Sequence, residues 1–211
     1  MLRLIQGDVG SGKTIVSLIA IANVIEAKYQ TAFMAPTGIL AKQHFNLAKK
    51  IFKGTKINIE LLTGKTKSYE KKTIIKKLYD NKINLLIGTH ALFQKKILFK
   101  KLGLIIIDEQ HKFGVKQRME LAKKGNNNCD LLLMSATPIP RTLILTFYGD
   151  MDVSRLIEKP SHRKEVITLS KPDEKIDEVL KFIKKQIAFG NQIFWVCPLI
   201  EESKKLDYAA A

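Results

Sequence analysis

Long hydrophobic runs and abundant cysteines are both missing from this chain. No apolar run approaches the roughly 18–20 residues that a membrane-spanning helix needs, so we expect no membrane association. The apolar stretch at the N-terminus is interrupted at residues 6–8, which is unlike a secretory signal peptide. Only two cysteines are present, Cys129 and Cys197, and neither lies near a cluster of metal-binding residues. These absences favour a cytoplasmic protein in a reducing environment.

Acidic residues and arginine are scarce relative to lysine. The chain has 36 Lys and Arg against 20 Asp and Glu, which gives a formal net charge of +16. Such a charge suggests a polyanionic partner, for example nucleic acid. Lysine, isoleucine and asparagine are all abundant, however, as AT-rich coding would produce. Charge alone therefore does not establish nucleic-acid binding.

The chain does contain a complete phosphate-binding pattern near its start. Residues 7–14, GDVGSGKT, fit G-x-x-x-x-G-K-[ST] at every fixed position. An apolar stretch predicted as a strand precedes them, and a predicted helix over residues 15–28 follows. This arrangement directs backbone N–H groups and a helix N-terminus at one point, which suits the phosphates of ATP. An ordinary glycine turn is the alternative. The predicted nucleotide-binding residues are Gly7, Asp8, Val9, Gly10, Ser11, Gly12, Lys13 and Thr14, with Lys13 on the phosphates and Thr14 on Mg²⁺.

The rest of the pattern predicts an α/β fold. Near-continuous apolar strands alternate with helices, which indicates a mostly parallel sheet covered by helices on both faces. Further strands are predicted over residues 31–36, 57–62, 84–87, 102–107 and 130–134. Further helices are predicted from residue 37 onward and over residues 65–81 and 115–124.

A change of composition near residues 158–164 predicts a linker between two domains. Residues 1–157 would form the first domain, and residues 165–211 the truncated start of a second. In the second we expect a strand over residues 166–169, a helix over 173–189 and a strand over 192–197. Two strands and one helix bury too little surface to be stable alone.

Two carboxylates follow the most hydrophobic predicted strand. At this strand end Asp108 can hold Mg²⁺ opposite Thr14, and Glu109 can polarise the attacking water. A helix N-cap followed by a first-turn acid is the alternative. His111 lies three residues beyond Asp108, close to the expected γ-phosphate, although a lone histidine near a turn is usually packed or solvated.

A hydroxyl-rich segment ends the neighbouring predicted strand. Ser135-Ala136-Thr137 follows the apolar residues 130–134. We predict that its hydroxyls bond to residues 108–111 and so couple the state of the nucleotide to domain motion.

These motifs, in this order, resemble those of superfamily 2 DNA helicases. The strings are GDVGSGKT, MAPTGILAKQH, TG, GTHAL, DEQHKFGVKQR and SATPIPRTL. Two further strings, TFYGDMDVS and FWVCPLIEES, favour the RecG-type branch-migrating helicases. The transcription-repair coupling translocase is the nearest rival, because it is similar through several of the same segments.

The resemblance implies a RecA-like P-loop fold, the cofactors ATP and Mg²⁺, and a role for each matching residue. Lys13, Asp108, Glu109 and His111 would be catalytic, and Gln110 would bind the nucleotide. Gln110 and His111 would also sense the state of the nucleotide. The implied contacts to a DNA strand are Pro36, Thr37, Thr63, Gly64, Gly88, Thr89, His90 and Arg141. Arg141 could instead contact the second motor domain.

The resemblance also has gaps. Lys112 and His162 stand where the family usually has arginine and glycine. The family's wedge domain, adenine-contacting segment and arginine finger have no counterpart in residues 1–211. The expected whole protein is a monomeric helicase that remodels forks and Holliday junctions in recombination and repair. The present chain is expected to bind Mg·ATP weakly and to hydrolyse it slowly.

Other functions compete with this one. A basic, non-catalytic remnant of a split gene could bind nucleic acid without any ATP cycle. The transcription-repair translocase and an RNA helicase are the rival motors.

Overall fold

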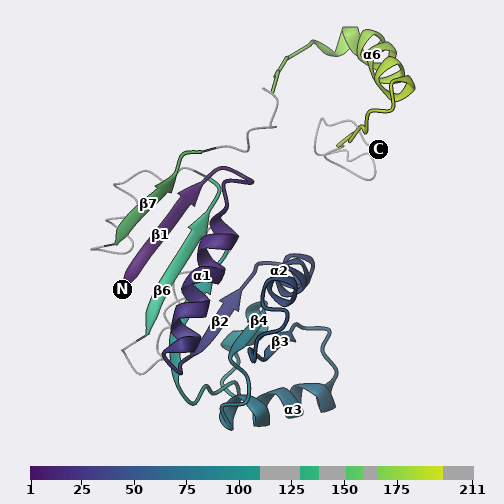
Figure 1. Cartoon of the computed structure of the whole chain (residues 1–211). Helices are drawn as coiled ribbons and strands as arrows, with labels where there is room; N and C mark the ends of the chain where they lie inside the picture. The colour runs from purple at the N-terminus through teal and green to yellow at the C-terminus, as the bar shows by residue number, and fades with distance from the viewer. Residues whose placement is uncertain (110–128, 138–150, 159–165, 197–211) are drawn as a thin grey trace. The chain divides into compact units, whose positions relative to one another are not determined.

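Seven strands of the described residues form one sheet in which every pairing is parallel. Their order across the sheet is β3-β4-β2-β5-β6-β1-β7 (Figure 1). The strands are β1 (Leu2–Gly7), β2 (Gln30–Met34), β3 (Ile59–Leu62), β4 (Leu85–Gly88), β5 (Leu102–Ile107), β6 (Asp130–Ser135) and β7 (Asp152–Leu156). The predicted parallel sheet is confirmed.

The chain divides into two units, Met1–Arg163 and Lys164–Ala211. This computed structural model describes residues 1–109, 129–137, 151–158 and 166–196. The helix predicted over residues 115–124 therefore lies outside the described residues. No helix in the described part of the chain is long and apolar enough to cross a membrane.

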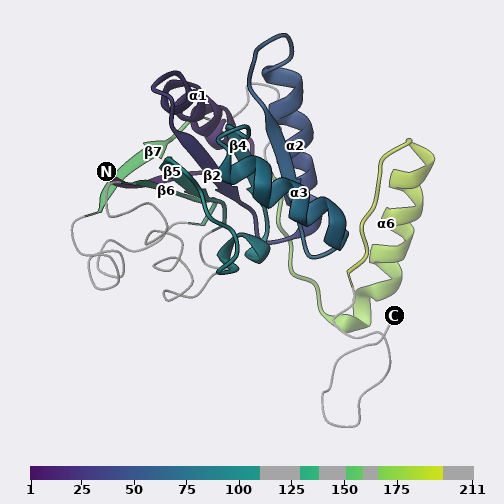
Figure 2. The same cartoon turned by 90° about the horizontal axis from the view of Figure 1, so that it is seen from below.

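Helices cover both faces of the sheet, as predicted. Helices α1 (Lys13–Glu26) and α2 (Gly38–Ile51) are labelled in Figures 1 and 2. They bury Leu18, Ile21, Ala41 and Ala48 in one core cluster. Helix α3 (Ser68–Tyr79) buries Ile74 and Leu78 in a second core cluster, which also holds residues that follow the 3-10 helix η1 (His90–Phe93). Successive strand residues join different clusters. Strands β4, β5 and β6 are almost continuously apolar because both of their faces are largely buried.

One buried polar side chain ties three segments of the first unit together. Gln30, at the start of β2, is only 1% exposed. Its Nε2 donates to the carbonyl oxygens of Leu78 at 3.0 Å and Ile83 at 2.9 Å. Its Oε1 accepts from the backbone N–H groups of Lys100 at 2.8 Å and Lys101 at 3.1 Å. The amide thereby satisfies the backbone at the end of α3 and before β5.

Replacing Gln30 by alanine is expected to lower the free energy of unfolding by about 3 kcal/mol, because buried backbone groups lose their partners. Urea unfolding followed by circular dichroism measures the change. The matched control is Gln43→Ala, which removes an exposed glutamine from α2 and should cost less than about 0.5 kcal/mol. A loss below about 1 kcal/mol for Gln30→Ala would contradict this account.

The thiol of Cys129 is partly buried beside the second core cluster, which contains Ile74 and Leu78 of α3. Burial raises its pKa to about 12, and the negative charge of Asp130 contributes further. Only the thiolate is nucleophilic, and a raised pKa leaves less thiolate at pH 8. We expect iodoacetamide to modify Cys129 at least about 100-fold more slowly in the folded chain than in urea. Peptide mapping by mass spectrometry measures both rates, and equal rates would contradict the burial.

Strand β7 was not predicted from the sequence. Its residues, DVSRL, contain no apolar run, and all of them are exposed or half-buried. The strand pairs with β1, where Arg3 donates to Asp152 Oδ2 at 2.9 Å and to Ser154 Oγ at 2.8 Å. These polar contacts place a strand at the sheet edge that hydrophobic patterning alone does not reveal.

The second unit corrects two strand predictions. Residues 166–169 and 192–196 form no strand, and Val166, Ile167 and Leu169 are largely exposed. A strand needs a neighbour to satisfy its backbone, and the described residues of this unit supply none. The predicted helix is present as the 3-10 helix η3 (Asp173–Lys175) and α6 (Ile176–Ala188).

Candidate nucleotide-binding site

The predicted site segments meet at one edge of the sheet. Because the strands are parallel, their carboxyl ends all lie at this edge. β1 ends in the phosphate loop, β5 is followed by Asp108, and β6, which lies between them, ends at Ser135. Chain order and strand order differ here, since β1 connects through α1 to β2 on the far side of β5 and β6. Open α/β sheets bind ligands in such a crevice.

The phosphate loop has a backbone conformation that depends on its glycines. Gly10 and Gly12 both adopt positive φ angles, 84° and 94°, which side chains with a Cβ rarely tolerate. Ser11 N–H donates to the Asp8 carbonyl at 3.1 Å, and Val9 N–H donates to Asp8 Oδ1 at 2.8 Å. The loop passes directly into α1 at Lys13.

Gly7 is required because its neighbours approach closely. A Cβ on Gly7 would lie 2.5 Å from Ser11 Oγ and 2.9 Å from Cβ of Leu156 in β7. Strand β7 therefore packs against the entry of the phosphate loop. The buried Ser11 hydroxyl has no hydrogen-bond partner among the described residues, so its hydrogen-bonding capacity fits a ligand rich in oxygen atoms.

The Lys13 ammonium group folds back over the loop. Its Nζ donates to the carbonyl oxygens of Gly7 at 2.6 Å and Asp8 at 2.9 Å. Thr14 follows at the start of α1, half-buried, and its carbonyl accepts from Ser17 Oγ at 2.7 Å. A cation at a helix N-terminus, with a hydroxyl beside it, suits a polyphosphate and its metal ion.

Asp108 is a buried carboxylate held from three directions. Its backbone N–H donates to the Met34 carbonyl at 2.8 Å, which continues the pairing of β5 with β2. Oδ1 accepts from Glu109 N–H at 3.0 Å, and Oδ2 lies 2.8 Å from His44 Nε2. Only 11% of the Asp108 side chain is exposed. The structure thus fixes both the backbone and the carboxylate of this residue.

Glu109 adopts a strained backbone conformation. Its φ angle is 47°, in the left-handed region that residues with a Cβ seldom adopt. Strain of this kind costs energy and is concentrated at functional sites. This conformation distinguishes Glu109 from an ordinary first-turn acid and is consistent with its predicted role.

His44 was missed by the sequence analysis. It lies on the buried face of α2 between Ala41 and Ala48, and its ring packs against Phe33 at 4.7 Å between centroids. The signal was available, because a histidine between two apolar positions at helical spacing must find a buried partner. Sequence alone could not identify that partner as Asp108, which is 64 residues away.

The hydroxyls that follow β6 bond to each other. Ser135 Oγ and Thr137 Oγ1 are 3.1 Å apart, and Thr137 N–H donates to Ser135 Oγ at 3.2 Å. Gln6 Nε2 in β1 donates to the Thr137 carbonyl at 3.2 Å, which ties this segment, including Ala136, to the phosphate-loop strand. The predicted bonds to residues 108–111 stay a prediction, because Gln110 and His111 lie outside the described residues.

The predicted DNA contacts differ in exposure. Thr37, Gly64 and His90 are exposed, and Pro36 and Thr63 are half-buried. Thr37 also caps α2, since its Oγ1 accepts from Leu40 N–H at 3.2 Å. These segments follow β2, β3 and β4, so they lie at the same sheet edge as the phosphate loop but toward its β3 end. Arg141 lies outside the described residues, as do Lys112 and His162.

Gly88 and Thr89 are buried, and the structure gives Gly88 a packing role. A Cβ on Gly88 would lie 2.2 Å from the Leu62 carbonyl oxygen of β3. Thr89 is 3% exposed, and its N–H donates to that same carbonyl at 3.3 Å. Of the predicted segment 88–90, only His90 presents its side chain to solvent.

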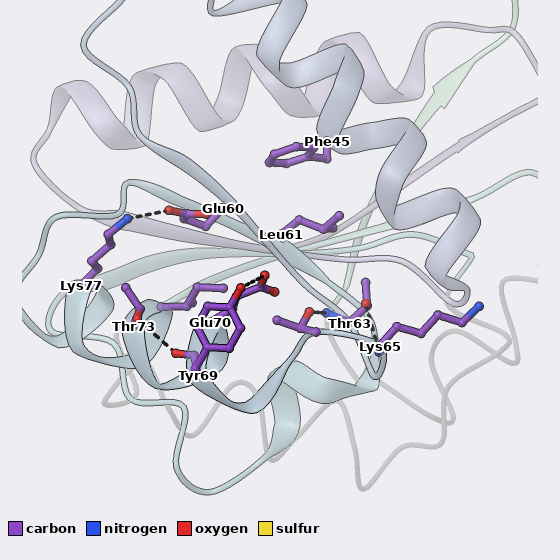
Figure 3. Close-up of a pocket in the computed structure, with 11 residues that line it drawn as sticks. Phe45, Glu60, Leu61, Thr63, Lys65, Tyr69, Glu70, Thr73 and Lys77 are labelled. Atoms are coloured by element: carbon purple, nitrogen blue, oxygen red, sulfur yellow. Dashed lines mark hydrogen bonds and ion pairs between the residues drawn. The ribbon is translucent and has the colours of Figure 1, made fainter.

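A shallow hollow of about 490 Å³ lies beside Thr63, between α2, β3 and α3 (Figure 3). Lys77 pairs with Glu60 at 3.1 Å, and Tyr69 Oη donates to Glu70 Oε1 at 3.0 Å. The hydrogen bond and charge of Glu70 raise the pKa of Tyr69. Acidic and basic groups balance in this hollow, so it does not form a continuous basic track.

Comparison with known proteins shows the family to which the chain is similar. A sequence profile of the DEAD/DEAH box helicases matches residues 3–145. Over its whole length the chain is 51% identical to the ATP-dependent DNA helicase RecG of Thermotoga maritima, of which it covers 27%. It is 47% identical to RecG of Bacillus subtilis over 98% of the chain and 30% of that relative. The resemblance to RecG-type helicases is confirmed, and the chain spans less than a third of these curated relatives.

Solved structures agree with the sequence matches. The structure of RecG bound to a three-way DNA junction superposes with a TM-score of 0.75 at 48% identity, over 90% of this chain and 25% of that one. A DEAD box protein from Methanococcus jannaschii superposes with a TM-score of 0.60 at 23% identity, over 74% of this chain and 46% of that one. The latter supports the fold alone. The parallel sheet is that of a RecA-like helicase core.

Proposed function

We propose that this chain, which belongs to the DEAD/DEAH box helicase family, is the first motor domain of a RecG-type DNA helicase. Residues 165–211 would then begin the second motor domain, after a linker over residues 158–164. The whole protein would use ATP to move on branched DNA in recombination and repair. The observation that carries this proposal is the shared sheet edge, where the phosphate loop and Asp108 lie two strands apart.

The chain's residues suit ATP and its metal ion. The ammonium group of Lys13, now on two loop carbonyls, is positioned to bind β- and γ-phosphates. Thr14 and Asp108 would hold Mg²⁺ through hard oxygen atoms, and a bound Mg²⁺ neutralises charge that develops on the phosphates. The described residues contain no group of three or more His, Cys, Asp or Glu around one point. Such a group is not required, since a magnesium site shared with phosphates uses only one or two carboxylates.

The reaction needs a positioned water as well as bound phosphates. Glu109 follows Asp108 directly and is half-buried at the same edge, so its carboxylate can accept a proton from the attacking water. Gln110 and His111 would contact the nucleotide from the next positions of the chain. Ser135 and Thr137, held to β1 through Gln6, would transmit nucleotide state to the second motor domain.

The DNA strand would run past the ends of β2, β3 and β4. A translocase must hold the phosphate backbone without reading bases, which suits small hydroxyls and free backbone groups. Thr37, Thr63, Gly64 and His90 are accessible for this purpose. Pro36 would shape the turn before Thr37. Gly88 and Thr89 would act indirectly, by packing β4 against β3, and Arg141 would contact either DNA or the second motor domain.

The relatives support a DNA substrate for the whole protein. A RecG relative has been solved on a three-way DNA junction, which supports branched DNA as the substrate of the whole protein. Over the whole of this chain, and 27% of the relative, the identity to a protein named RecG is 51%. This identity supports a RecG-type motor over the transcription-repair translocase or an RNA helicase. We propose further that the whole protein acts as a monomer in the cytoplasm and uses a wedge domain, as the resemblance to RecG-type helicases implies.

A chimera tests the proposal. Residues 1–211 replace the matching stretch of Thermotoga maritima RecG, and ATP hydrolysis is measured with forked DNA, duplex DNA and RNA. We expect forked DNA to stimulate hydrolysis at least about tenfold more than RNA. The same chimera carrying Lys13→Ala gives the background. A folded chimera that hydrolyses ATP equally with RNA, or without regard to nucleic acid, would overturn the DNA-helicase assignment.

A further inference from the structure

We propose that His44 is a positioning residue for Asp108, whose carboxylate it holds in one orientation at the sheet edge where Mg²⁺ would bind. The inference rests on the proposed nucleotide site. It adds a residue of α2, outside the phosphate loop and the segment 108–111, to the groups on which the metal depends.

The geometry of the pair is specific. His44 Nε2 lies 2.8 Å from Asp108 Oδ2, and about a tenth of each side chain is exposed. An ionised carboxylate can only accept, so Nε2 carries the proton and donates. The second carboxylate oxygen accepts from Glu109 N–H at 3.0 Å. With one donor on each oxygen, the carboxylate cannot rotate without breaking a hydrogen bond.

His44 is itself held firmly. Its ring packs against Phe33 of β2, and β2 pairs directly with β5, the strand that ends beside Asp108. Its helix neighbours on the buried face are Ala41 and Ala48, whose small side chains let α2 approach the sheet. The imidazole is thus fixed by a helix and by the strand adjacent to β5. Supporting groups of this kind typically change metal affinity 10–100-fold when they are removed.

Sheet pairing alone would not orient the carboxylate. The Asp108 N–H bond to Met34 fixes the backbone, yet two side-chain torsions stay free to turn. The hydrogen bond from His44 restricts these torsions, and it comes from α2 and not from the Asp108-Glu109 segment itself. A His44–Asp108 pair that only stabilises the fold would show the same short distance and the same burial. The test must therefore measure metal binding separately from stability.

Binding of Mg²⁺ to the nucleotide complex provides that separation. The 211-residue chain is saturated with a fluorescent ATP analogue in EDTA, and Mg²⁺ is then titrated while fluorescence is recorded. His44→Asn is polar but too short to reach Asp108, whereas His44→Gln places an amide N–H near the position of Nε2. His44→Leu removes the donor, and Asn46→Ala is the control on the exposed face of α2. Thermal melting without nucleotide measures the fold of each variant.

We expect His44→Asn and His44→Leu to raise the half-saturating Mg²⁺ concentration about tenfold or more, and His44→Gln to stay within about threefold of the parent chain. Asn46→Ala should match the parent, and nucleotide affinity in EDTA should change little in any variant. Equal Mg²⁺ affinity in folded His44→Asn and the parent would overturn the inference and leave the nucleotide site standing. A parent chain that binds nucleotide without regard to Mg²⁺ would overturn the metal site and the inference together.

Discussion

Replacing Lys13 by alanine is expected to weaken the binding of Mg·ATP by about 100-fold or more. The ammonium group would bond to two phosphates, and charge-assisted hydrogen bonds are each worth about 1.5–3 kcal/mol. In the structure this group donates to the Gly7 and Asp8 carbonyls, and binding of the phosphates would exchange those bonds for charge-assisted ones. Fluorescence titration of the 211-residue chain with an ATP analogue measures the change.

The control for Lys13 is an exposed lysine away from the sheet edge. Lys53→Ala removes the same charge just after α2 and should leave nucleotide affinity within about twofold. Circular dichroism shows that both variants are folded. Unchanged affinity in folded Lys13→Ala would show that nucleotide, if bound, does not occupy the phosphate loop.

The 211-residue chain by itself is expected to hydrolyse ATP at least about 10³-fold more slowly than full-length RecG of Thermotoga maritima with forked DNA. An arginine finger is worth about 10³–10⁵ in rate in comparable NTPases. In the proposed motor this arginine would come from the second motor domain, of which residues 165–211 would be only the start. Release of phosphate measures both rates at saturating ATP.

The comparison of ATPase rates includes a control for contaminating activity, and one result would contradict the account. The Lys13→Ala chain, purified in the same way, reports contaminating ATPase. DNA-stimulated turnover of the parent chain within about tenfold of the full-length relative would contradict the account. Residues 1–211 would then already hold the complete catalytic machinery.

The sequence predicted most of the sheet because strands such as β2, β4 and β5 are buried on both faces. Residues 102–107, LGLIII, were predicted as a strand with the bounds that the structure gives to β5. The phosphate loop was equally predictable, since Gly10 and Gly12 are needed for their positive φ angles and Lys13 for its charge. Predicted and observed element ends differed where a local turn sets them. The helix predicted over residues 65–81 begins only at Ser68 in α3, after a turn between Thr63 and Thr66.

The features that could not be predicted depend on contacts far apart in the sequence. Strand β7 makes polar contacts with Arg3 of β1. Gly88 is required because its backbone lies close to the Leu62 carbonyl of β3. His44 meets Asp108 because α2 brings its ring against Phe33 of β2, the strand that pairs with β5. The wrong strands of the second unit were apolar enough to form strands but have no pairing partner among the described residues.

A crystal structure of the 211-residue chain with Mg²⁺ and a non-hydrolysable ATP analogue tests the central claim most directly. The account predicts the triphosphate on the backbone N–H groups of residues 8–14, with Lys13 moved from the loop carbonyls onto the phosphates. It also predicts Mg²⁺ between the Thr14 hydroxyl and Asp108, with His44 still bonded to the carboxylate. Nucleotide bound away from the phosphate loop, or Mg²⁺ bound without Thr14 and Asp108, would contradict it.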